Sequence, residues 1–189
     1  MKFIDLESER LIYRKFREED FSVLFDWRGN AENMKYWMSG QKNEAETREY
    51  LNWVISNAEA EDCTNYEFAV VLKTDNSLIG SAMMINLPDE PEMGWVLHRN
   101  YWRQGYGTEM GKTLLRFGFE TLNLRRIIAG CNARNTGSYR IMEKIGMRRE
   151  AHFIKAQRGS SLLNYEWCDR FQYAILQEEW KSAKAVDID

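Results

Sequence analysis

The stretch that decides the fold runs from Glu92 to Met147. It opens with the apolar run Met93-Gly-Trp-Val-Leu97, which predicts a strand, and continues into the turn Arg103-Gln-Gly-Tyr-Gly-Thr108. Apolar residues then recur near helical spacing and predict a helix from Glu109 to Thr121. A strand that leads into a glycine turn and then into a helix is a typical phosphate-binding arrangement.

The turn carries the predicted chemistry. Gly105 and Gly107 allow a tight backbone path whose N–H groups point outward together. The following helix adds unpaired N–H donors and the positive end of its dipole. These features predict that the turn binds a pyrophosphate compound, although glycine turns serve several cofactors.

Two of these cofactors are disfavoured by the residues that follow the turn. A dinucleotide fingerprint requires a third glycine three positions after Gly107, where Met110 stands. A triphosphate-binding loop requires Gly-Lys-Ser/Thr, but Gly107 is followed by Thr108 and Glu109. A glutamate at the start of the helix would also repel a triphosphate.

The remaining pattern matches a known family. The segment from Trp95 to Glu109 resembles the acyl-CoA-binding motif of the GNAT N-acetyltransferases. A second strand is predicted over Arg126–Cys131. The pattern Asn132-x-x-Asn135-x-x-Ser138 and the short predicted helix that ends in Met142-Glu-Lys-Ile-Gly-Met147 resemble the second motif of the same family.

Within the family, the chain resembles the ribosomal-protein N-terminal acetyltransferase branch. The run Ser8-Glu-Arg-Leu-Ile-Tyr-Arg14 is similar to the first strand of that branch. The general motif begins Gln/Arg-x-x-Gly-x-Gly/Ala, whereas Trp102 stands at its first position here. Because tryptophan is familiar at this position in the branch, we interpret it as a mark of the subtype and not as a loss of binding.

The predicted fold is of the α+β class. Strands precede and follow helices without strict alternation, which favours a mixed, largely antiparallel sheet with helices on both faces. The resemblance implies a GNAT-like acyl-CoA N-acyltransferase fold with about seven strands. It also implies that the central strand and Arg126–Cys131 lie parallel and splay apart, so that the cofactor enters between them.

The flanking segments supply the other predicted elements. They are a strand at Leu11–Tyr13, helices from Glu18, around 34–38 and over Thr47–Ala58, strands at Tyr66–Leu72, Leu78–Leu87, Arg149–Ala156 and Asn164–Leu176, and a partly helical tail from Gln177.

Length and composition predict a single soluble domain. The 189 residues, with 44% hydrophobic and 29% charged side chains, suit one globular N-acetyltransferase domain over residues 1–189, with its motif core at 92–147 and a short acidic tail at 177–189. No apolar run is long enough for a membrane span. The three cysteines are odd in number and far apart, which favours the reducing cytoplasm, and no Cys/His cluster has metal-ligand spacing.

Charge is distributed unevenly along the chain. Residues 1–98 contain 10 Lys/Arg and 19 Asp/Glu, whereas residues 99–170 contain 14 Lys/Arg and 6 Asp/Glu. Opposite potentials at two ends of one cleft would steer an anionic cofactor and a cationic amine to their own sides. The competing interpretation is that sequence halves intermix in the fold and that the charges serve only solubility.

The resemblance implies a set of cofactor-binding residues. The central strand would lie beside the thioester, the loop amides would hold the pyrophosphate, and the second motif would contact the pantetheine arm. Asn135 just before a helix also suits an N-cap, and one residue can do both. The residues are Trp95, Val96, Leu97, Arg103, Gln104, Gly105, Tyr106, Gly107, Thr108, Asn132, Asn135 and Ser138.

The catalytic residues are predicted from the chemistry of acyl transfer. The leaving thiolate takes a proton, and the hydroxyl of Ser138 or Tyr139 would supply it, with Ser138 favoured because the related branch aligns serine there. The attacking amine must be neutral, and Glu92 at the start of the central strand is the candidate base, directly or through water. Asp89, Glu90 and Glu150 are its rivals, and each of these carboxylates also suits a solvated surface position.

The predicted function is an acetyl-CoA-dependent N-acetyltransferase with direct transfer in a ternary complex, as a monomer or a homodimer. The acceptor would be a protein or peptide N-terminus, a polyamine, an amino sugar or an aminoglycoside. The alternative is a non-catalytic acyl-CoA-binding or regulatory protein on the same fold. Nucleic-acid binding through the basic middle of the chain is disfavoured, because the net charge is −3 and no recognition motif accompanies the arginines.

Overall fold

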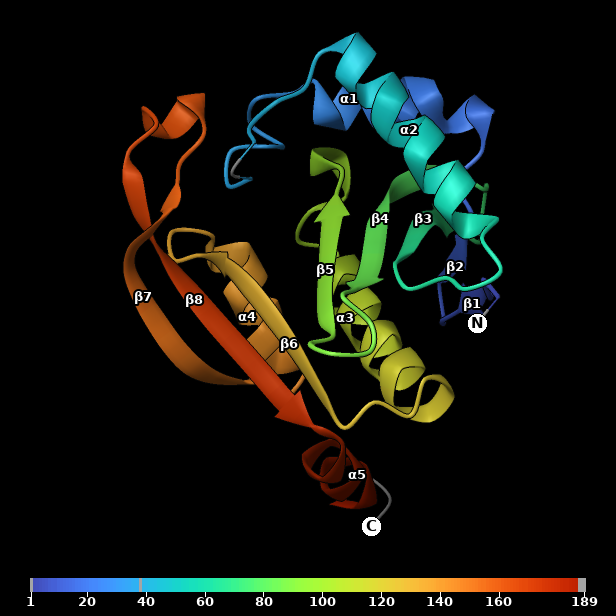
Figure 1. Cartoon of the computed structure of the whole chain (residues 1–189), viewed down its shortest axis with the longest axis vertical. Helices are drawn as coiled ribbons and strands as arrows, with labels where there is room; N and C mark the ends of the chain where they lie inside the picture. Colours follow the sequence, from blue (N-terminus) through green and yellow to red (C-terminus); the bar gives the residue numbers. More distant parts are fainter. Residues whose placement is uncertain (1, 38, 187–189) are drawn as a thin grey trace.

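Eight strands form one mixed sheet in the structure, a computed structural model that describes residues 2–37 and 39–186 (Figure 1). The strands are β1 (Leu6–Glu7), β2 (Leu11–Arg14), β3 (Tyr66–Leu72), β4 (Leu78–Ile85), β5 (Glu92–Leu97), β6 (Arg126–Asn132), β7 (Arg148–Arg158) and β8 (Trp167–Leu176). The helices are α1 (Phe21–Arg28), α2 (Glu44–Ala58), α3 (Tyr106–Arg116), α4 (Thr136–Lys144) and α5 (Gln177–Val186).

The sheet is mixed and largely antiparallel, as predicted. The order is β1-β2-β3-β4-β5-β6-β8-β7, and every neighbouring pair is antiparallel except β5 and β6, which are parallel. The sheet has eight strands, where about seven were predicted. The additional strand, β1, contains two residues, which is too short for an alternating pattern to reveal.

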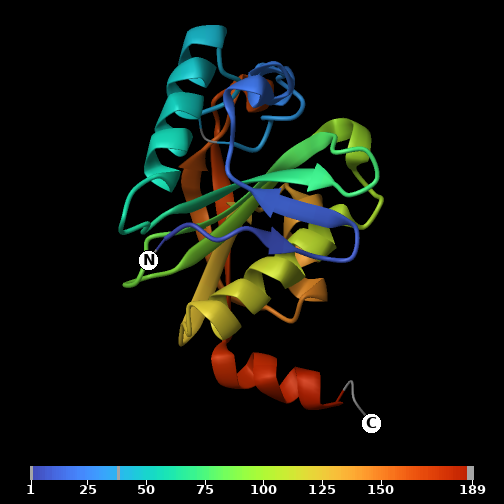
Figure 2. The same cartoon turned by 90° about the vertical axis from the view of Figure 1, so that its right-hand side faces the viewer.

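Helices cover both faces of the sheet (Figures 1 and 2). Alternate residues of a strand point to opposite faces. In β5, Met93 packs in the core cluster that contains Met110 of α3, whereas Val96 packs in the second cluster with Leu24 of α1 and Leu51 of α2. One face therefore carries α3 and α4, and the other carries α1 and α2. Helix α5 extends beyond the end of the sheet (Figure 2).

The parallel strands β5 and β6 separate almost as soon as they meet. Their register contains the single pair Glu92 and Ile128, and the Ile128 N–H donates to the Pro91 carbonyl at 2.9 Å. Beyond this point β6 pairs with β8 along its whole length. The splay that the resemblance implies is thus present.

The splay leaves part of the β5 backbone directed away from β4. In an antiparallel pair, the polar groups of alternate residues face the partner strand. The His98 N–H donates to Ile79 of β4, so the odd-numbered residues of β5 direct their backbone groups to the other side. Trp95 and Leu97 therefore present backbone N–H and C=O groups to the open side of the splay.

One predicted helix is wrong. Around residues 34–38 the sequence predicts a helix, but residues 31–36 form consecutive turns, and Met38 lies outside the described residues. The reason is tertiary, because this segment bonds to other elements. The Gln157 side chain donates to the Tyr36 carbonyl at 3.1 Å, and the Ser160 hydroxyl donates to the Lys35 carbonyl at 2.6 Å.

Two helix boundaries also differ from the prediction. Helix α2 begins at Glu44, not at Thr47, because Asn43 caps it by accepting from the Glu46 N–H at 2.9 Å. Helix α3 begins at Tyr106, not at Glu109, and the predicted end at Thr121 is reached through a π-helical turn over Phe117–Thr121. The glycine turn therefore merges with the first turn of α3.

Candidate active site

A cavity of about 860 Å³ lies at the C-terminal end of β5, between the turn before α3, helix α4 and the segment 32–37. Its lining residues come from four parts of the chain: Trp95, Val96 and Leu97; Trp102, Arg103, Gly105, Gly107 and Thr108; Asn135–Ile141 and Lys144; and Glu32, Asn33, Tyr36 and Trp37. The cavity thus joins the predicted phosphate turn, the splayed strand and a segment from the N-terminal half of the chain.

The turn adopts the conformation that its glycines were predicted to allow. Gly105 is the N-cap of α3 with a φ of 85°, a left-handed conformation that glycine adopts without strain. Gly107 has a different role. A Cβ atom there would lie 2.6 Å from the Ile141 Cδ1 atom, so the missing side chain lets α4 approach α3. The first N–H groups of α3 and the residues of α4 therefore line the same cavity.

Trp102 ties the turn to the strand. Its indole N–H donates to the Leu97 carbonyl at 2.7 Å. The Asn33 side-chain amide donates to the same carbonyl at 3.1 Å, and the Asn33 side-chain oxygen accepts from the Arg99 N–H at 2.9 Å. The Leu97 carbonyl thus accepts two hydrogen bonds, one from the turn before α3 and one from the segment 32–37, and holds both against the end of β5.

Glu109 does not direct its charge at the cavity. Its carboxylate accepts from the Ser8 hydroxyl and the Arg10 N–H and forms an ion pair with the Arg10 guanidinium at 2.7 Å. Partial burial opposes ionisation, but these bonds lower the pKa of Glu109 overall. The sequence suggested that Glu109 would repel a triphosphate. Ser8 and Arg10, which belong to the run that resembles the first strand of the branch, bind this carboxylate and offset its charge.

Two predicted cofactor residues of the turn direct their side chains elsewhere. The Gln104 side chain donates to the Asn100 carbonyl at 3.0 Å, and the Arg10 guanidinium lies 4.3 Å from the centre of the Tyr106 ring. Neither residue lines the cavity.

The second motif divides between structural and cavity-lining residues. Asn135 is the N-cap of α4, and its side chain accepts from the Ser138 N–H at 3.1 Å. Ser138 and Tyr139 line the cavity from the first turn of that helix. Asn132 is 1% exposed, its side-chain oxygen accepts from the Arg134 N–H at 2.9 Å, and it lies behind the lining.

Ser138 lies beside a buried thiol at the end of β6. Burial raises the pKa of Cys131 to about 11, while a hydrogen bond with the Ser138 side chain partly opposes this shift. The ring of Tyr139 packs edge-on against Phe171 with 5.7 Å between ring centres. Of the two predicted proton donors, Ser138 has its hydroxyl beside the Cys131 thiol, whereas the ring of Tyr139 is oriented by packing against Phe171.

The predicted base Glu92 lies at the wrong end of β5 for this cavity. It occupies the closed end of the splay, outside the lining residues, and forms an ion pair with Arg170 at 3.3 Å. Burial raises the pKa of Glu92, the Arg170 charge opposes this shift, and the Glu90 charge adds to it. Asp89 and Glu90 precede β5 at the same closed end.

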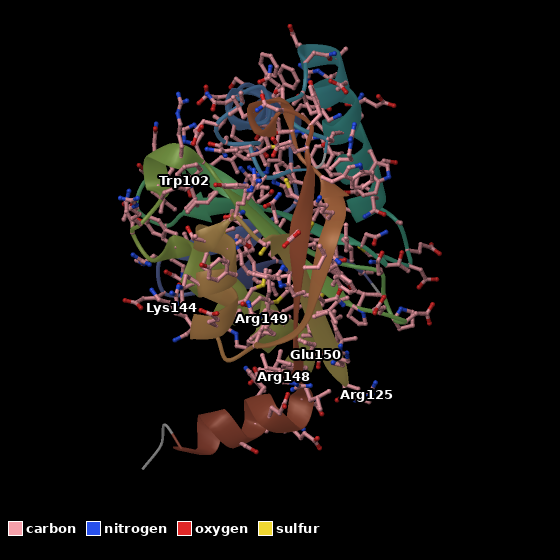
Figure 3. The ribbon with its side chains drawn as sticks, turned by 90° about the vertical axis from the view of Figure 1, so that its left-hand side faces the viewer. Trp102, Arg125, Lys144, Arg148, Arg149 and Glu150 are labelled. Carbon is pink, nitrogen blue, oxygen red and sulfur yellow. The ribbon has the colours of Figure 1, made fainter. Side chains whose placement is uncertain are left out.

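The rival base Glu150 is also remote. Hydrogen bonds with Arg126 and Arg148 lower the pKa of Glu150 to about 2, which makes it a weak proton acceptor. In Figure 3, Glu150 and Arg148 lie near α5, well separated from Trp102. The carboxylate that does line the cavity is Glu32, which no local sequence pattern identified.

His98 has a structural role in the described structure. Its Nδ1 atom accepts from the Asn100 N–H at 3.2 Å, and its Nε2 atom lies 2.6 Å from an Asp26 carboxylate oxygen, so the proton belongs on Nε2. The ring therefore caps the short helical turn at Arg99–Tyr101 that leads into Trp102.

Two further searches cover the described part of the chain. No group of three or more His, Cys, Asp or Glu residues within it is arranged to hold a metal ion. None of the helices in residues 2–37 and 39–186 combines the length and apolar character that a membrane crossing requires.

Comparison with known proteins identifies the family. The acetyltransferase (GNAT) domain model matches residues 10–148. The uncharacterized N-acetyltransferase YnaD of Bacillus subtilis (strain 168) is 36% identical over 179 residues, which cover 93% of this chain and 98% of that protein.

Solved structures agree with this match. A GNAT-family acetyltransferase from Bacillus anthracis is 36% identical with a TM-score of 0.81, over 93% of this chain and 99% of that one. The spermidine N-acetyltransferase of Vibrio cholerae, solved with CoA and spermine, shares the fold with a TM-score of 0.77 at 20% identity, over 92% of this chain and 99% of that one. The chain therefore belongs to the GNAT acetyltransferase family, a family of acyltransferase enzymes.

Proposed function

We propose that this enzyme transfers an acetyl group from acetyl-CoA to a primary amine, directly and within a ternary complex. The observation that carries the proposal is the single cavity, in which the amide turn before α3, the free edge of β5 and the segment 32–37 meet. A cavity that these three parts of the chain share suits a direct transfer, in which binding replaces an encounter in solution.

The turn and α4 would hold the acyl donor. The N–H groups of the first turn of α3 and the positive end of its dipole suit the pyrophosphate of acetyl-CoA. Arg103 of the turn lines the same part of the cavity and would add a charge-assisted bond. Asn135 would contact the pantetheine arm while it continues to cap α4.

The free edge of β5 would position the thioester. Backbone N–H groups at Trp95 and Leu97 face the open side of the splay, where they would donate to the thioester oxygen as it becomes an oxyanion. Donors fixed in a strand need no reorganisation when this charge develops. Ser138, one helix away, would protonate the leaving thiolate, and Tyr139 is the second candidate.

The acceptor would enter beside the segment 32–37. Tyr36 and Trp37 offer aromatic surfaces there, and Glu32 offers a negative charge, a combination that suits a cationic amine. Peptide N-termini, polyamines, amino sugars and aminoglycosides all meet this description. The ribosomal-protein branch, suggested by the first strand and by Trp102, makes peptide N-termini one class to test.

Thiol release from acetyl-CoA in the presence of an amine panel tests the proposal. The panel contains N-terminal peptides, lysine peptides, polyamines, amino sugars and aminoglycosides, each measured with and without enzyme. Enzyme-dependent release with one class would support the transfer and identify the acceptor. Binding of acetyl-CoA without release for any class would favour an acyl-CoA-binding role on this fold.

A further inference from the structure

The charges that line the cavity are segregated. Arg103, Arg140 and Lys144 line the side formed by the turn and α4, which suits the phosphates of the acyl donor. On the opposite side, Glu32 is the one carboxylate among the described lining residues. The negatively charged side chain of the lining therefore lies in the segment 32–37, beside which the acceptor would bind.

The backbone next to Glu32 is fixed against the reacting strand. Asn33 bonds to both the Leu97 carbonyl and the Arg99 N–H, at 3.1 and 2.9 Å. The carbonyls of Lys35 and Tyr36 are held by side chains from the β7–β8 end of the sheet. Glu32 is thus adjacent in sequence to Asn33, whose two hydrogen bonds fix the segment to the end of β5. The thioester carbonyl would lie at this end of the strand.

The Glu32 carboxylate is available for a substrate. Its nearest cation is Lys35 at 3.7 Å, beyond hydrogen-bond distance, and its side chain is 55% exposed. Glu109 and Glu150 are each held by an arginine within 2.7 Å, and Glu92 is paired with Arg170 at the closed end of the splay. Of the carboxylates considered, Glu32 alone lines the cavity, and its one ion pair among the described residues, with Lys35, is longer than a hydrogen bond.

We propose that Glu32 is the proton acceptor for the acceptor amine, an inference that rests on the proposed acetyl transfer. The nitrogen lone pair attacks the thioester carbon, and a C–N bond forms. The nitrogen, now positively charged, gives its proton to the Glu32 carboxylate. The C–S bond then breaks with its electron pair on sulfur, and the thiolate takes up a proton.

The timing of this proton transfer follows from the acidities involved. A free alkylammonium has a pKa near 10.4, far above that of an ordinary carboxylic acid, so the ammonium loses its first proton to solvent before the attack. Once the nitrogen is bonded to the carbonyl carbon, its proton is far more acidic and the transfer becomes favourable. An ammonium substrate therefore releases one net proton to solvent in each turnover.

Replacement of the carboxylate tests the inference. Glu32→Gln keeps the size of the side chain and removes the base, and Glu32→Asp keeps a shortened base. Glu49→Gln is the matched control, because it removes one exposed negative charge from α2, outside the cavity lining. The measurements are kcat and KM for the best amine of the panel from pH 6 to 10, together with the acetyl-CoA dissociation constant.

We expect Glu32→Gln to lower kcat by about 100-fold or more at every pH from 6 to 10, because general-base catalysis typically contributes about 10²–10⁴-fold. Glu32→Asp should keep the pH dependence with a lower kcat, and acetyl-CoA binding should be unchanged in all variants. A Glu32→Gln enzyme with the kcat and pH profile of Glu49→Gln, or with a raised KM alone, would overturn the assignment. Failure of the proposed function is distinct, because the unmodified enzyme would then be inactive with every amine.

Discussion

The Trp102 indole N–H donates to the Leu97 carbonyl at 2.7 Å and thereby joins the glycine turn before α3 to the end of the splayed strand. Trp102 is 42% exposed, so burial alone does not explain a tryptophan at this position. The hydrogen bond does, because it fixes the path of the backbone into Arg103 and Gly105. The residue that departs from the general family motif thus has a defined structural role.

Trp102→Phe should weaken acetyl-CoA binding about fivefold. The variant keeps an aromatic ring and loses one hydrogen bond, which contributes about 1 kcal/mol to the position of the turn. Calorimetric titration with acetyl-CoA measures the effect. Trp167→Phe is the control, since Trp167 is 54% exposed and lies outside the cavity lining. Equal affinities for the two variants would show that the turn holds its shape without this bond.

Ser138→Ala should lower kcat by about 10- to 100-fold while acetyl-CoA affinity stays the same. The physical reason is that the departing thiolate would lose the hydroxyl that we propose as its proton donor. Tyr139→Phe is the paired variant, because it removes the other candidate hydroxyl and keeps the packing against Phe171. Steady-state kcat values of both variants, measured with a slow and a fast acceptor, show which hydroxyl protonates the thiolate. Full turnover by Ser138→Ala together with a slow Tyr139→Phe would reassign the acid to Tyr139.

Much of the fold was predictable because its signals are local. The run Met93–Leu97, the two glycines and the second motif each occupy one continuous stretch, and the family resemblance that they carry implied the parallel pair and the splay. The same locality explains the error at residues 34–38. There, aromatic and Met residues at helical spacing predict a helix, but bonds from Gln157 and Ser160, distant in the sequence, hold turns instead.

The candidate site was less predictable for the same reason. Glu92 was a reasonable base from its place at the start of the central strand, but the two ends of a six-residue strand lie well apart, and the cavity is at the other end. Glu32 has no distinguishing neighbours in the sequence. Only the folding of its segment against Leu97, through Asn33, brings this carboxylate to the cavity.

Lys144 should distinguish acetyl-CoA from its 3′-dephospho analogue. It lines the cavity from the end of α4 and has no ion-pair partner among the described residues, so a phosphate beyond the pyrophosphate would suit it (Figure 3). Lys144→Gln should weaken acetyl-CoA binding by up to about fivefold, the range of an exposed ion pair, and leave dephospho-CoA binding unchanged. The control is Lys112→Gln, an exposed α3 lysine outside the lining. An equal loss for both ligands would place the contact on the pyrophosphate.

Glu67 should make the folded protein lose stability as the pH rises toward neutrality. Burial raises the pKa of Glu67 to about 7, although the Tyr50 hydroxyl, which donates to it at 3.0 Å, and the Arg28 charge oppose this shift. The unfolded chain ionises first, near pH 4.5, so the unfolded state binds fewer protons between pH 4.5 and 7 and stability falls by about 3 kcal/mol over that range. Above pH 7 this contribution is constant.

Denaturant unfolding of Glu67→Gln and the unmodified protein at several pH values measures this contribution. The amide keeps an acceptor for Tyr50 and does not titrate, so the stability of the variant relative to the unmodified protein should rise from pH 4.5 to 7. The Arg28 charge is constant over this range and cancels in the comparison. A difference that does not change with pH would mean that Glu67 ionises near its ordinary pKa in the folded state.

Gly107→Ala should damage stability and acetyl-CoA binding together, because one contact serves both. The added methyl group would lie 2.6 Å from the Ile141 Cδ1 atom, so Ile141 must change its rotamer or α3 and α4 must separate, and both helices line the cavity. Such overpacking costs about 1–3 kcal/mol, which exceeds the gain of about 1 kcal/mol that alanine brings to a helix. Acetyl-CoA affinity should fall about tenfold, measured by calorimetry beside denaturant unfolding.

The second variant, Ile141→Val, removes the Cδ1 atom that the new methyl group would meet. Alone it should cost about 0.5–1.5 kcal/mol through lost packing, but combined with Gly107→Ala it should recover most of the lost stability and affinity. Gly137→Ala is the control for helix propensity, since the nearest atom to its Cβ would be 3.6 Å away, an ordinary contact. If Gly107→Ala were as stable as Gly137→Ala, the spacing of α3 and α4 would not depend on this glycine. Recovery in the double variant would instead establish that the second glycine of the turn acts through helix packing, whereas Gly105 supplies a left-handed backbone conformation in the turn.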